Sequence, residues 1–150
     1  MIRVQQHAFD AGDELRALKE GQSHIGGTVM FLGTVRDMSG GQDVKAMTLE
    51  HYPGMTEKAL EEIEAEAKRR WPLDASLIIH RYGRLEPGED IVLVITASAH
   101  REAAFAACHF LIDWLKTKAP FWKLEEGDDG ASWVAAKESD DDAAQRWEKG

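Results

Sequence analysis

Two apolar runs with strand character, residues 76–82 and 91–98, are joined by the short segment 83–89. Runs rich in β-branched and apolar residues are typical of strands. Parallel strands need a crossover of about a dozen residues or more, and this segment is too short to hold a helical one. The two runs are therefore expected to pair as antiparallel strands. This predicts an α+β fold, with a mainly antiparallel sheet and flanking helices, rather than a doubly wound parallel sheet.

Helices are predicted where apolar residues recur three and four positions apart. Asp10 can cap the first helix and Thr56 the second. Trp71-Pro72 ends the second helix, and Ala119-Pro120 ends the third. The helices are expected over 10–19, 56–70 and 101–116, and further strands over 2–7, 26–36, 46–52 and 132–138.

Composition narrows the class of protein. The chain has 150 residues, of which 43% are hydrophobic, and a net charge of −9. This length suits one domain, residues 1–150. The negative charge argues against a general nucleic-acid binder, which needs a basic face. No apolar run approaches the ~20 residues of a membrane span, and the first residues lack the apolar core of a signal peptide. We therefore expect no membrane partner and a cytoplasmic location.

The single cysteine, Cys108, limits the chemistry open to the chain, because it excludes an internal disulfide and a Cys-x-x-Cys pair. Cys108 falls within a helical pattern and is expected to pack in the core. Glu50-His51 is not a metal pair, and no other spacing suits zinc or magnesium. The sequence therefore predicts neither a metal site nor a cofactor.

Cations gather where the third helix ends, in the segment Lys116–Lys123, which also carries Phe121 and Trp122. Lys123 follows Pro120, where the chain can turn back toward Lys116. His100-Arg101 opens the same helix, at a terminus whose free N–H groups and dipole favour an anion. An anionic substrate is the expected ligand of these cationic clusters.

Several strings in the chain closely resemble the large, catalytic subunit of molybdopterin synthase: 31–36, 49–55, 79–83, 98–101 and 116–125. The resemblance spans roughly residues 2 to 147. It implies an α+β fold with a hammerhead-like part and a homodimer. It also implies a small ubiquitin-like sulfur-carrier subunit at each end, two per dimer. The implied reaction takes sulfur from a thiocarboxylate on the carrier's C-terminal Gly-Gly and forms the dithiolene of molybdopterin from cyclic pyranopterin monophosphate.

The resemblance also implies roles for individual residues. Lys116 is expected to act as general acid or base, or to polarise the thiocarboxylate carbonyl, because crowded cations favour the neutral amine. Lys123 is the second catalytic residue and is expected to bind substrate or an intermediate. Lys137 matches a position that is commonly arginine and reaches into the neighbouring subunit's pocket. The full expected substrate-binding set is Thr34, Val35, Arg36, His100, Arg101, Lys116, Lys123, Leu124, Glu125 and Lys137.

Two other functions remain open from the sequence. The chain could be a non-catalytic dimeric scaffold that binds a glycine-tailed ubiquitin-like partner. It could also be a phosphoester-processing enzyme that uses the same cations. The lack of a paired-carboxylate metal motif weighs against the second alternative. Product formation from a thiocarboxylated partner would separate an enzyme from a scaffold.

Overall fold

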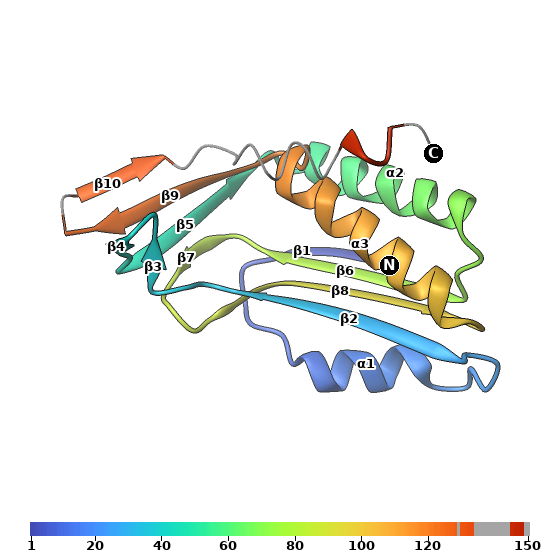
Figure 1. The fold of residues 1–150 in the computed structure, drawn as a ribbon. Helices are drawn as coiled ribbons and strands as arrows, with labels where there is room; N and C mark the ends of the chain where they lie inside the picture. The colour runs from blue at the N-terminus through green and yellow to red at the C-terminus, as the bar shows by residue number, and fades with distance from the viewer. Residues whose placement is uncertain (129, 134–144, 149–150) are drawn as a thin grey trace.

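The computed structural model describes residues 1–128, 130–133 and 145–148 of the chain. Its larger sheet contains β1 (Ile2–Gln5), β2 (Gly27–Thr34), β6 (Ala75–Arg81) and β8 (Asp90–Ser98), and its helices are α1 (Ala11–Lys19), α2 (Met55–Arg70) and α3 (Arg101–Thr117). The strand order is β1-β6-β8-β2, with β1 parallel to β6 and the other neighbours antiparallel. Helix α1 covers one face of this sheet, and α2 and α3 cover the other (Figure 1).

Strands β6 and β8 are apolar along most of their length because helices pack against both of their faces. On one face, Ile78 and Val94 belong to a core that includes Leu60 of α2 and Leu111 of α3. Residues that point to the other face pack against α1: Leu77, Ile79, Leu93 and Ile95. Burial on both faces explains why these strands form nearly continuous hydrophobic runs instead of alternating ones.

The predicted antiparallel pairing of β6 with β8 is confirmed, with Ile78 opposite Val94. The connection between them holds a further strand, β7 (Gly83–Leu85), that the sequence did not predict. Strand β7 pairs with β5 (Ala46–His51) in a second sheet. The short connection therefore links the two sheets.

The second sheet has the order β10-β9-β5-β7, and all its neighbouring strands are antiparallel. It adds β9 (Phe121–Gly127) and β10 (Gly130–Trp133), and it extends away from the end of α3 (Figure 1). A small hairpin, β3 (Met38–Ser39) and β4 (Gln42–Asp43), lies in the loop after β2. Strand β9 was not predicted, and of the strand expected over 132–138, residues 134–138 lie outside the described residues. The α+β class is confirmed.

The predicted helix caps have different outcomes. Asp10 caps α1, because its Oδ1 accepts the Asp13 N–H at 2.8 Å. The prediction that Thr56 caps α2 is wrong, since the cap position is Gly54 and the helix begins at Met55. Thr56 is instead fully buried, and its hydroxyl donates to the Tyr52 carbonyl at 2.8 Å. Its side chain holds the chain entering α2 against the first turn.

Candidate functional site

A cavity of about 410 Å³ opens where the two sheets meet the end of α3. Its charged lining residues are Arg36, Lys116, Lys123 and Glu125, so among the described residues cations outnumber carboxylates there. The chain as a whole carries a net charge of −9. The positive lining is therefore a local feature, and it suits an anionic ligand.

Strand periodicity places the functional side chains of β9. Alternate residues of a strand point to the same face, and Phe121, Lys123 and Glu125 all line the cavity. Trp122 is exposed and makes an edge contact with Tyr52, at 4.3 Å between ring centroids. Leu124 is not among the residues that line the cavity, so any contact of its side chain with substrate stays a prediction.

The chain just beyond the end of β2 positions Arg36 at the cavity. The pairing of β2 with β8 shifts register between Gly33 and Thr34. Beyond the shift, Thr34 and Arg36 line the cavity, whereas the Val35 side chain is buried in the core. The absence of a side chain at Gly33 has a packing reason, because a Cβ there would lie 2.5 Å from Cγ1 of Val92. The backbone of Gly33 thus packs directly against the Val92 side chain, and both residues line the cavity.

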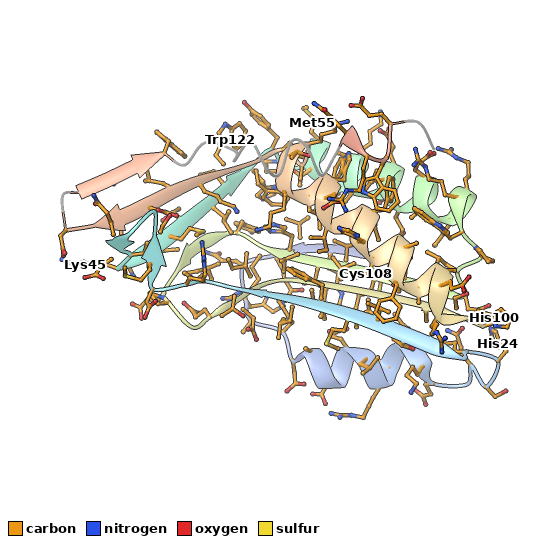
Figure 2. All side chains as sticks on the ribbon, in the orientation of Figure 1. His24, Lys45, Met55, His100, Cys108 and Trp122 are labelled. Carbon is orange, nitrogen blue, oxygen red and sulfur yellow. The ribbon has the colours of Figure 1, made fainter. Side chains whose placement is uncertain are left out.

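His100 and Arg101 do not reach this cavity within one chain. They lie at the start of α3, whereas Lys116 lies in its last turn, and a rise of ~1.5 Å per residue separates Arg101 from Lys116 by about 22 Å. Figure 2 shows His100 far from Trp122 on β9. Both His100 and Arg101 are exposed. The two cationic clusters share one helix, but they occupy its opposite ends.

Sequence reasoning missed one residue that the structure brings to the cavity, His80 of β6. Its ring stacks on Phe121, with centroids 3.8 Å apart and an interplanar angle of 17°. Burial lowers the pKa of His80 to about 4, and the positive charges of Lys123 and Lys116 act in the same direction. Its place in the family-like string 79–83 was the signal that could have drawn attention to it.

The remaining lysines near the site differ in position. Lys118 is exposed, does not line the cavity and lies 3.9 Å from the Glu148 carboxylate. Lys137 lies outside the described residues, so its expected reach into a neighbouring subunit stays a prediction. Lys118 therefore serves as a natural control for Lys116, two positions away on the same chain.

Cys108 is buried, and burial raises the pKa of its thiol to about 11. A thiol in this state reacts poorly, because the thiolate is the nucleophile. Within the ranges that the structure describes, no cluster of His, Cys, Asp or Glu could hold a metal ion, and no helix is long and apolar enough to cross a membrane. Cys108 thus fits its predicted packing role.

Comparison with known proteins agrees with this geometry. The sequence model of the MoaE protein family matches residues 4–118. A molybdopterin synthase catalytic subunit from Pseudomonas aeruginosa is 60% identical over 99% of each chain, and one from Escherichia coli is 52% identical over 97% of each. The solved MoaE protein of Burkholderia ambifaria superposes with a TM-score of 0.83 at 53% identity, over 98% of this chain and 97% of its own.

An α+β fold with cations around a partly aromatic cavity suits a protein that binds a small anionic molecule. The matches identify the family. The chain belongs to the MoaE family, and its curated relatives are molybdopterin synthase catalytic subunits. The family predicted from the sequence motifs is confirmed. The predicted enzyme class, a sulfurtransferase subunit of molybdenum cofactor biosynthesis, is confirmed as well.

Proposed function

We propose that the cavity binds cyclic pyranopterin monophosphate and that Lys116 and Lys123 promote sulfur transfer to it from a thiocarboxylated carrier subunit. The convergence of Arg36, Lys116 and Lys123 on one cavity carries this proposal. The cavity volume of about 410 Å³ lies within the ~300–1,000 Å³ typical of small-molecule sites. A flat ring fits against Phe121, and a phosphate fits the cations.

Each transfer replaces a carbon–oxygen bond of the pterin side chain with a carbon–sulfur bond and breaks the carbon–sulfur bond of the thiocarboxylate. The oxygen displaced from the pterin side chain leaves on the phosphate or as water. The acyl carbon takes an oxygen from water and leaves as a carboxylate. Lys116 transfers the protons or polarises the acyl carbonyl. Lys123 holds the substrate or intermediate, and the neighbouring Glu125 orients an amine. The sulfur comes from outside the chain, since Cys108 is buried and its pKa is raised.

The carrier's Gly-Gly tail enters beside the last turn of α3. Thr117 and Ala119 line the cavity on this side, and Met38 and Ser39 of β3 line it on another. We expect the passage between these segments to be narrow, so that it admits a backbone without side chains, such as a glycine tail. Enlarging the carrier's terminal glycine is expected to block transfer more than docking.

The distance between the two cationic clusters supports a homodimer with two composite sites. Strand β2 is at the edge of its sheet and exposes Met30 and Leu32. It begins against Arg101, since a Cβ at Gly27 would lie 3.2 Å from the Arg101 Cα, and its other end reaches the cavity. If two β2 edges pair antiparallel about a two-fold axis, Arg101 of one chain lies near the cavity of the other.

Reconstitution tests the function directly. The chain is mixed with a thiocarboxylated carrier and cyclic pyranopterin monophosphate, and dithiolene product is measured. Lys116→Ala should lower turnover at least about 100-fold, the lower range for loss of a general acid or base. Lys118→Ala, the matched control, should leave turnover unchanged. Carrier binding without product in the unmodified chain would instead identify a scaffold.

A further inference from the structure

His80 lies at a wall of the cavity that other site residues also form. Its side chain is only 6% exposed, yet it lines the cavity together with Phe121, Lys116 and Lys123. Phe121 and Lys123 are two positions apart on β9, so both point to the face on which His80 stacks. The ring of His80 is therefore next to the position at which the proposed chemistry occurs.

The tautomer of His80 follows from its hydrogen bond. Nδ1 lies 2.8 Å from the backbone carbonyl oxygen of Arg81. A carbonyl oxygen only accepts, so Nδ1 carries the hydrogen and donates it. The ring is neutral at physiological pH because its pKa is lowered to about 4, by burial first and then by Lys123, His51 and Lys116 against the raising effect of the Arg81 carbonyl. Nε2, at the tip of the ring, is therefore left with a lone pair that can only accept.

Nε2 is not sealed inside the core. Within the described part of the chain, the buried side-chain nitrogens that lack a partner are Arg3 Nε and His51 Nδ1. His80 Nε2 is not one of them, and within the described residues the hydrogen bond of this ring is made by Nδ1, so Nε2 reaches the cavity that the ring lines. The cavity thus presents a neutral acceptor at its aromatic wall, whereas its cationic side chains are donors only.

We propose that Nε2 of His80 is the hydrogen-bond acceptor that recognises an N–H group of the substrate's fused ring at the Phe121 wall. This inference rests on the proposed function, in which that ring is a pterin. The cations Arg36, Lys116 and Lys123 take the anionic part of the substrate, and the neutral imidazole takes a donor on the ring. A ring that presents a lone pair at this position is rejected, because two acceptors would face each other without a hydrogen.

Matched substitutions separate recognition from structure. His80→Asn keeps an amide donor at the position of Nδ1 but removes Nε2, and His80→Gln places an amide at the position of Nε2. His80→Asn should raise the KM for cyclic pyranopterin monophosphate about tenfold with little change in kcat, since a ring donor loses its partner. His80→Gln should recover part of this loss. His51→Asn, whose ring centroid lies 6.0 Å from that of Phe121 and which does not line the cavity, should leave KM unchanged.

A spectroscopic measurement on the unmodified chain covers the case in which a variant fails to fold. With ¹⁵N-labelled histidine, cyclic pyranopterin monophosphate should shift the Nε2 resonance of His80 upfield, and inorganic phosphate should not. An unmoved Nε2 resonance with saturating substrate, or a His80→Asn chain with unchanged KM, overturns the inference while product formation still supports the proposed function. Failure of the unmodified chain to form product with a thiocarboxylated carrier overturns the proposed function itself.

Discussion

Mixed dimers test whether Arg101 and Lys116 serve the same site from different chains. Lys116→Ala and Arg101→Ala each impair every site of their own homodimer if the sites are composite. With the pterin substrate well below its KM, the roughly tenfold higher KM expected for Arg101→Ala makes its sites nearly inactive. In a mixed dimer, the Lys116 of one chain meets the Arg101 of the other, so one site has both residues and the second site has neither. The separation of about 22 Å along α3 makes the same restoration impossible if each chain forms its site alone.

The expected magnitude follows from counting sites. Random association of equal amounts makes half of the dimers mixed, and half of the sites in these are intact, so about a quarter of unmodified activity returns. The two chains are coexpressed with different tags, and turnover is measured with the thiocarboxylated carrier in excess. Mixing Lys116→Ala with Lys123→Ala is the control, because both lysines line one cavity and no mixed site is whole. Equal turnover in the two mixtures would refute the composite site.

Three further outcomes are expected. Arg101→Ala should raise the KM for the pterin substrate about tenfold or more, since the Arg101 guanidinium is assigned to the phosphate. The Kd for the carrier, measured by calorimetry, should stay unchanged. Loss of carrier binding alone would reverse that assignment. Because the pKa of His80 is lowered from 6.5 to about 4, the unfolded chain binds the extra proton between these values, so the free energy of unfolding falls as the pH drops through this window. In urea unfolding, the contribution of His80 to this fall in the free energy of unfolding should be about 2 kcal/mol between pH 7 and pH 4.5, and His80→Phe should lack it. An equal fall in both chains would contradict the prediction. Gly26→Ala should cost about 3 kcal/mol or more in the same assay, since its Cβ would lie 1.9 Å from the Ala99 carbonyl oxygen, and near-normal stability would show that the backbone yields there.

Elements with a strong local signal could be predicted from the sequence. The apolar spacing of α2 and α3 and the apolar runs of β6 and β8 lie within single segments, and all of these elements were found within a few residues. Strands β7 and β9 were missed, because they carry charged residues and depend on pairing with β5, which is distant in the sequence. Thr56 was assigned to the wrong position since a glycine cap leaves no side-chain signal.

Some site residues could likewise be identified from local sequence, whereas others depend on contacts between segments that are distant in the sequence. Lys116 and Lys123 could be identified from a cationic segment and Arg36 from the family resemblance, and the cavity does gather them. The predicted helix over 101–116 already placed Arg101 and Lys116 at opposite ends, but the sequence did not show that the cavity forms only at the Lys116 end. His80 lies within the family-like string 79–83, but nothing local showed that it lines the cavity. Its neutral state arises from burial and from lysines far along the chain.

The burial of Cys108 has a consequence for how this enzyme tolerates oxidants. Peroxide and alkylating agents attack thiolates, and a thiol whose pKa is raised to about 11 offers almost none at neutral pH. The folded chain should therefore pass through oxidative stress without a lesion at its cysteine. Under the proposed function, the reactive sulfur that oxidants can reach is then the carrier's thiocarboxylate rather than Cys108.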